Sequence, residues 1–158
     1  MISSSWDPLE TELSSELAAA TMKREIKNIL KSYTGWYDPF SELLQNALDA
    51  VEHRSQKEKD YDPEIWVDID LKDNKISVTD NGIGFSEDQF KSFLAPSVSF
   101  KTQTDRGNKG VGATYLGYGF NYLQVGTKTE HFSFIGTLKD AREWVEDVSG
   151  TKIRPKIQ

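Results

Sequence analysis

The segment ELLQNALDA, residues 42–50, decides how the rest of the chain is interpreted. This helix segment lies in a run over residues 38–56 that begins with Asp-Pro and has the apolar spacing of a helix. Glu42, Asn46 and Asp49 are spaced i, i+4 and i+7, so they share one helical face. Such side chains most often face solvent. The functional alternative is a carboxylate that orients or deprotonates water, beside an amide oxygen that holds a hard cation such as magnesium.

A short turn segment, residues 80–84, follows a predicted β-hairpin. Residues 64–79 contain two stretches of alternating apolar and polar side chains with a polar turn between them. The sequence Asp-Asn-Gly favours an ordinary tight turn, but such a turn does not need a second glycine. Gly82 and Gly84 together would let the backbone approach a flat ligand. The Asp80 carboxylate would then accept a hydrogen bond from an exocyclic amine.

A glycine loop, RGNKGVGAT at residues 106–114, enters a predicted helix over residues 110–122. Glycine-rich turns before a helix leave backbone N–H groups pointing at one place, where the helix dipole adds positive potential. Arg106 and Lys109 add charge, so the loop is a candidate phosphate site. The plain alternative is a flexible loop with a glycine cap. The Walker pattern fits no window, and Tyr115 stands where the dinucleotide fingerprint needs its third glycine.

In this order the three segments resemble the ATP-binding module of the GHKL superfamily, which includes DNA gyrase, the heat-shock-90 chaperones, histidine kinases and MutL mismatch-repair proteins. ELLQNALDA is similar to the asparagine-bearing motif, DNGIGF to the second motif and GNKGVGAT to the glycine-rich lid. The resemblance covers about residues 40–139. It implies an α+β protein with the Bergerat fold. This is a two-layer α/β sandwich in which helices cover one side of a mixed, mostly antiparallel sheet, with ATP between the helices and a mobile lid.

The resemblance also implies the roles of single residues. Glu42 would be the general base that activates the attacking water, and Asn46 would coordinate the Mg²⁺ that bridges the phosphates. Asp49 would lie near the adenine base or the ribose. In the turn segment, Asp80 would take the adenine amino group, with Gly82 beside it and Gly84 packing under the base. The remaining residues would contact the phosphates: Lys109, Gly110, Val111 and Gly112.

The carboxylate at position 42 helps to choose among the branches of the superfamily. The gyrase-like, chaperone-like and MutL-like members keep a catalytic Glu at this position and hydrolyse ATP. Histidine kinases instead phosphorylate a histidine upstream of the asparagine motif. His53 and His131 both follow Glu42, so self-phosphorylation is not expected. The lid matches none of these branches closely and looks most like that of uncharacterised bacterial ATP-binding proteins of the chaperone-like type.

Two functions follow from the resemblance. The first is a magnesium-dependent ATPase switch, in which ATP closes the lid and drives a conformational change or homodimerisation. The second is a nucleotide-binding regulatory module without turnover that acts through partner proteins. An interaction domain whose glycines only serve turns is the alternative outside nucleotide binding. The sequence does not identify the client or partner.

Composition sets limits on these functions. The chain has 158 residues, a net charge of −6 and no cysteine. A mean hydropathy of −0.58 argues against a membrane span, and the absent cysteines exclude disulfides and thiolate zinc sites. The acidic total argues against a polymeric anion, so nucleic acid is not indicated. No signal peptide is evident at the start, which makes a cytoplasmic location the expectation.

The expected organisation is an N-terminal helical arm over residues 1–35 and a GHKL-type ATP-binding domain over residues 36–158. We expect a tail that is frayed from Lys152, and a late strand that begins at residues 150–152 just before the sequence stops. The chain would then be the N-terminal portion of a larger protein and hydrolyse ATP slowly alone. The other elements are expected as helices at residues 9–33, 38–56, 86–94, 110–122 and 140–147 and strands at residues 64–71, 76–79, 123–128 and 131–139.

Overall fold

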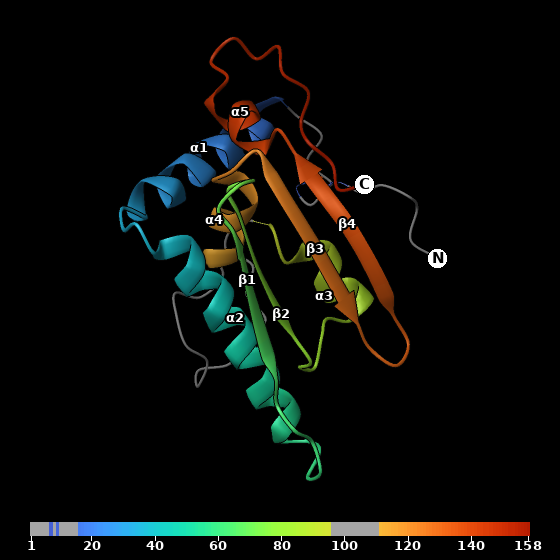
Figure 1. The fold of residues 1–158 in the computed structure, drawn as a ribbon. Helices are drawn as coiled ribbons and strands as arrows, with labels where there is room; N and C mark the ends of the chain where they lie inside the picture. Colours follow the sequence, from blue (N-terminus) through green and yellow to red (C-terminus); the bar gives the residue numbers. More distant parts are fainter. Residues whose placement is uncertain (1–6, 8, 10–15, 96–110) are drawn as a thin grey trace.

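The computed structural model describes Asp7, Leu9, residues 16–95 and residues 111–158. Helices and strands follow one another in the predicted order, which confirms the α+β class (Figure 1). The helices are α1 (Glu16–Ser32), α2 (Asp38–Ser55), α3 (Glu87–Ser92), α4 (Gly112–Tyr118) and α5 (Ala141–Glu146). The strands are β1 (Ile65–Asp70), β2 (Lys75–Asp80), β3 (Tyr122–Lys128) and β4 (Ser133–Lys139).

Local sequence signals explain where two of these helices begin. Pro39 is in the first turn of α2, where its missing N–H costs nothing. Ser86 precedes α3 and forms the predicted capping box with Gln89, because each side chain accepts a hydrogen bond from the other residue's backbone. None of the described helices is long and apolar enough to cross a membrane.

The N-terminal helix begins later than predicted. Leu9, expected inside the helix, lies in a turn, and its backbone N–H donates to the Asp7 carboxylate at 2.9 Å. The same carboxylate pairs with the Arg154 guanidinium at 2.5 Å. Residues 10–15 lie outside the described residues, and α1 begins at Glu16. Asp7 is thus joined to Arg154, a residue far away in the sequence.

The described strands form two separate two-stranded antiparallel sheets, β1–β2 and β3–β4, where one mixed sheet was expected. In the first, Ile65 lies opposite Asp80. Strand β2 ends at Asp80, and among the described residues no backbone ladder joins it to β3. A side-chain contact replaces it: the Phe85 backbone N–H donates to the Thr127 hydroxyl of β3 at 2.8 Å.

The core lies among the helices and β4. Its buried residues come from distant parts of the chain: Leu9, Ile26, Leu94, Tyr118, Leu138, Ala141, Trp144, Val145 and Ile157. Helix α4 packs against α1, α2, α5 and β3, while α2 packs against β2. The helix that follows the glycine loop is therefore the centre of the helical layer.

The C-terminal tail packs onto β4, so the prediction of a frayed tail is wrong. Ile157 pairs with Leu138 in an antiparallel bridge and is fully buried. Thr137 and Gln158 exchange backbone hydrogen bonds at 2.7 and 3.1 Å. The late strand expected at residues 150–152 is also misplaced, since those residues are exposed and outside any strand. Pairing occurs where an apolar side chain can enter the core.

Candidate functional site

Glu42 of α2 is buried and lies where the helix segment meets the glycine loop. Its side chain accepts a hydrogen bond from the Tyr33 hydroxyl at 2.8 Å. A β-carbon placed on Gly112 would lie 2.6 Å from the Glu42 Cδ atom, so Gly112 is directly against the carboxylate. Asp49 is also buried and Asn46 is partly buried, which excludes the solvent-facing interpretation of this stripe.

The Tyr33 side chain is a feature of this site that the sequence analysis missed. Its ring stacks on Tyr115 of α4, with centroids 3.9 Å apart and planes 2° from parallel. Burial and the neighbouring Glu42 carboxylate raise the pKa of the Tyr33 hydroxyl above its ordinary value. The available signal was the short connection between the first two predicted helices, which keeps the end of one beside the start of the other.

The turn segment lies directly on α2. A β-carbon on Gly82 would come within 2.7 Å of the backbone oxygen of Ala50, and the Ile83 N–H donates to that oxygen at 3.1 Å. The Gly82 N–H donates to the Asp80 carboxylate at 2.8 Å. Gly82 therefore allows the turn segment to approach α2 closely just after Asp49. From the sequence, Gly82 was expected to allow approach to a flat ligand. The helix segment and the turn segment meet here.

The Asp80 carboxylate is the partly buried acid at the end of β2. Burial raises its pKa above the ordinary value, while the hydrogen bond from the Gly82 N–H lowers it; burial is the larger effect. A carboxylate that has lost much of its water gains more from a hydrogen-bond donor than an exposed one. The position can thus recognise an amino group.

Gly84 links the turn segment to the second hairpin. Its φ of +67° lies in the left-handed region, and a β-carbon there would be 2.7 Å from the Lys128 backbone oxygen. Both observations require glycine. The packing of Gly84 under the adenine stays a prediction from the sequence.

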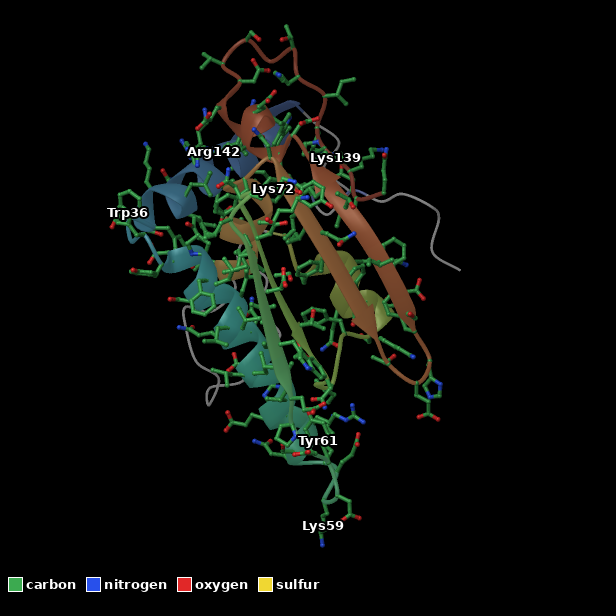
Figure 2. The ribbon with its side chains drawn as sticks, in the orientation of Figure 1. Trp36, Lys59, Tyr61, Lys72, Lys139 and Arg142 are labelled. Carbon is green, nitrogen blue, oxygen red and sulfur yellow. The ribbon has the colours of Figure 1, made fainter. Side chains whose placement is uncertain are left out.

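Asn81 anchors the turn segment to the chain around it. Its side-chain oxygen accepts from the Tyr61 hydroxyl and, at 2.9 Å, from the Glu64 N–H, while its amide donates to the Asp62 carbonyl at 2.8 Å. Arg54 of α2 donates to the Asn81 backbone oxygen at 2.7 Å and lies over the Tyr61 ring. Tyr61 marks this cluster at the lower end of α2 in Figure 2. Asn81 had no predicted role from the sequence alone.

The glycine loop is only partly described. Lys109 and Gly110 lie outside the described residues. Val111 precedes α4 and its carbonyl accepts the Tyr115 N–H at 2.8 Å, while Gly112 is the first residue of the helix. The structure thus places the end of the candidate phosphate loop beside Glu42.

The donor set fits a magnesium ion that is shared with a nucleotide. Among the described residues no group of three or more histidine or acidic side chains is arranged to hold a metal. Magnesium, however, is commonly bound by one or two protein oxygens together with substrate phosphates and water. The partly buried Asn46 lies one helical turn after Glu42 and can supply such an oxygen.

A family model covers all three of these segments. The model for histidine kinase-, DNA gyrase B- and HSP90-like ATPases matches residues 35–123, more than half of the chain. No curated protein matches the chain closely enough to count as a relative. The matched range contains Glu42, Asp80 and Gly112. The chain therefore belongs to the family of histidine kinase-, DNA gyrase B- and HSP90-like ATPases and contains a GHKL-type ATP-binding domain.

Proposed function

We propose that the chain is a magnesium-dependent ATPase switch domain in which Glu42 is the catalytic base. The observation that carries this proposal is the burial of Glu42 against Gly112, which lies in the last part of the candidate phosphate loop. A base must lie within reach of the water that it activates, and the water must lie beside the terminal phosphate. Glu42 meets this requirement if the phosphates bind at the glycine loop.

Different residues would bind different parts of the ATP molecule. Asp80 accepts a hydrogen bond from the adenine amino group with Gly82 and Gly84 beside it, and Asp49 lies near the base or ribose. Val111 and Gly112, with Lys109 and Gly110 outside the described residues, contact the phosphates. Asn46 holds Mg²⁺, which supplies positive charge to the phosphate oxygens when it is bound.

The chemical step is the hydrolysis of ATP to ADP and phosphate. Glu42 orients a water and takes one of its protons as the water oxygen attacks the terminal phosphorus. The bond between that phosphorus and the bridging oxygen breaks, and the electron pair leaves with ADP. Electrostatic stabilisation and positioning supply most of the catalysis in such reactions. Backbone N–H groups at Val111 and Gly112 and the Asn46 oxygen are the groups that this chain contributes.

Closure of the glycine loop would connect ATP binding to the rest of the molecule. Helix α4 follows the loop directly and packs against α1, α2, α5 and β3. A shift of α4 would therefore displace its neighbours, which include α1 and strand β3 of the β3–β4 sheet. We propose that this movement drives a conformational change or homodimerisation, in the cytoplasm, with a client or partner protein that is not identified.

The test is ATP turnover by the purified chain with magnesium, alongside calorimetric measurement of ATP binding. Glu42→Gln is expected to bind ATP as wild type does and to lose hydrolysis. Glu52→Gln, an exposed position on the same helix, is the control and keeps wild-type turnover. Equal turnover in wild type and Glu42→Gln would contradict the assignment of the base.

A regulatory module without turnover is the second candidate. The Tyr33 hydroxyl already occupies one oxygen of the Glu42 carboxylate, which leaves only the other oxygen to hold a water. Calorimetry separates the two candidates: ATP binding without hydrolysis, even at high protein concentration, supports the regulatory module.

A further inference from the structure

We propose that Tyr33 is a positioning residue for Glu42: its hydroxyl holds one carboxylate oxygen, so that the other faces Gly112 and the end of the glycine loop. This inference rests on the proposed function, because it assigns Tyr33 to the same hydrolytic site. Tyr33 follows α1 directly and lies just before the exposed Trp36, which marks the junction with α2 in Figure 2.

The two oxygens of the Glu42 carboxylate have different surroundings. Oε1 accepts the Tyr33 hydroxyl at 2.8 Å. Oε2 is the atom nearest to the position that a β-carbon on Gly112 would occupy. The carboxylate is therefore oriented by a donor on one side and by the start of α4 on the other. An attacking water that sits beside the glycine loop would meet Oε2.

The Tyr33 ring is itself held in place. It stacks on Tyr115, and Tyr115 makes an edge contact with Phe120 at 5.7 Å between centroids. Tyr115 lies on α4, one turn after Gly112. Both contacts of the carboxylate thus depend on α4: one directly through Gly112, the other through the stacked tyrosines. A shift of α4 on nucleotide binding would change the orientation of Glu42.

The protonation state of Tyr33 suits this role. Burial and the Glu42 carboxylate raise the pKa of the hydroxyl above its ordinary value of 10.0. The Tyr33 hydroxyl therefore stays protonated at neutral pH. In its hydrogen bond with Glu42 it is the donor, and the carboxylate is the acceptor. Positioning by Tyr33 does not require a change of charge.

Tyr33→Phe tests the role, because it removes the hydroxyl and keeps the ring that stacks on Tyr115. We expect kcat for ATP to fall about tenfold, as loss of a hydrogen bond to a charged group predicts, with KM unchanged. Tyr37→Phe is the matched control: it removes the same group at a position 78% exposed, and kcat stays as in wild type. In the Glu42→Gln background, Tyr33→Phe should cause no further loss of kcat. Equal kcat in wild type and Tyr33→Phe would overturn the inference while leaving the proposed function intact.

A second measurement does not depend on turnover. The chain has six tyrosines, and isotope labelling at the tyrosine Cζ atom gives each one an NMR signal. The signal that disappears in Tyr33→Phe belongs to Tyr33, and we expect it to move most of the six in Glu42→Gln. An unmoved signal would overturn the Tyr33–Glu42 contact. Absence of ATP turnover in wild type would instead overturn the proposed function, and a moved signal would still support the contact.

Discussion

The α-carbon of Gly112 lies directly against the Glu42 carboxylate, so that a β-carbon at position 112 would come within 2.6 Å of the Glu42 Cδ atom. Real β-carbons essentially never lie closer than 3.0 Å to another heavy atom, so a β-carbon at position 112 would force one of the two groups to shift. Gly112 does not have a positive φ, so the backbone alone does not require glycine. A larger residue would instead have to push the Glu42 side chain aside. This contact joins two segments that are far apart in sequence, and it links the candidate base to the helix after the glycine loop.

Gly112→Ala is therefore expected to displace the Glu42 side chain. The free energy of unfolding should fall by about 1–3 kcal/mol, as overpacking of a buried position usually costs, and ATP turnover should fall with it. Gly126→Ala is the control, since its β-carbon would meet nothing closer than 3.6 Å. Urea denaturation and a turnover assay of the two variants provide the comparison.

The cause of that loss can be separated from a general effect on α4. In the double variant Gly112→Ala with Glu42→Ala, the methyl group no longer meets a carboxylate. We expect a coupling energy of about 0.5–3 kcal/mol in the favourable direction, which is the range for residues in contact. Strictly additive losses in unfolding free energy would show that the clash lies elsewhere.

Gly84→Ala is expected to destabilise the domain by two effects, a strained backbone conformation and a steric clash. Gly150→Ala has only the first effect and therefore serves as the comparison. Both residues have positive φ, at +67° and +72°, where an alanine costs about 1–2 kcal/mol. Only at Gly84 would the new β-carbon also lie 2.7 Å from a backbone oxygen, that of Lys128, whereas nothing lies within 4 Å at Gly150. Chemical denaturation should therefore show a larger loss for Gly84→Ala. Equal losses would mean that β3 moves aside freely.

Local sequence patterns predicted those helices and strands whose signals lie within a few neighbouring residues. The Asp-Pro start gave α2 its first residue, alternation gave the β1–β2 hairpin, and Ser86 with Gln89 gave the capping box of α3. The positions of Glu42 and Asp80 on those elements were accessible in the same way. Each of these signals is a periodicity or a cap whose physical cause lies within a few residues.

Long-range packing produced what the sequence did not predict. The Tyr33–Glu42 hydrogen bond needs two helix ends to meet, and the role of Asn81 depends on partners in α2 and in the loop before β1. The docking of Ile157 beside Leu138 is likewise set by a space in the core that no local window reveals. The same holds for the division of the described strands into two sheets, which no single hairpin pattern reveals.

The tail docking itself is testable. Ile157→Ala should lower the free energy of unfolding by about 2–5 kcal/mol, because it removes a fully buried side chain from the core. Ile153→Ala makes the same deletion four residues earlier at a position 90% exposed, and should change stability by no more than about 0.5 kcal/mol. Thermal or urea unfolding of both variants measures the difference. A small effect at Ile157 would show that the tail contributes little to the folded state.

Asp80→Asn is expected to weaken ATP binding by about tenfold or more. The carboxylate is the proposed acceptor for the adenine amino group, and a hydrogen bond to a charged group contributes about 1.5–3 kcal/mol. The asparagine side-chain oxygen can still accept the Gly82 N–H, so the turn segment should keep its shape. Asp68→Asn, an exposed carboxylate on β1, controls for the lost negative charge. Calorimetry with ATP and magnesium is the measurement; unchanged binding would remove Asp80 from the adenine site.

The same substitution should change stability in the opposite direction. Burial raises the folded-state pKa of Asp80 above its ordinary value of 3.8, so the folded protein binds this proton more tightly than the unfolded chain. The wild-type free energy of unfolding therefore decreases as pH rises from the ordinary value through the raised one, and the cost persists at neutral pH. Asparagine does not ionise and avoids that cost. We expect Asp80→Asn to be more stable than wild type at pH 7. The difference should vanish at a pH below the pKa of Asp80 in both the folded protein and the unfolded chain, where the wild-type carboxyl group is also neutral. Unfolding measured across that pH range, with Asp68→Asn as control, tests the sign, since a variant less stable than wild type at pH 7 would show that Asp80 is stabilised in its charged form.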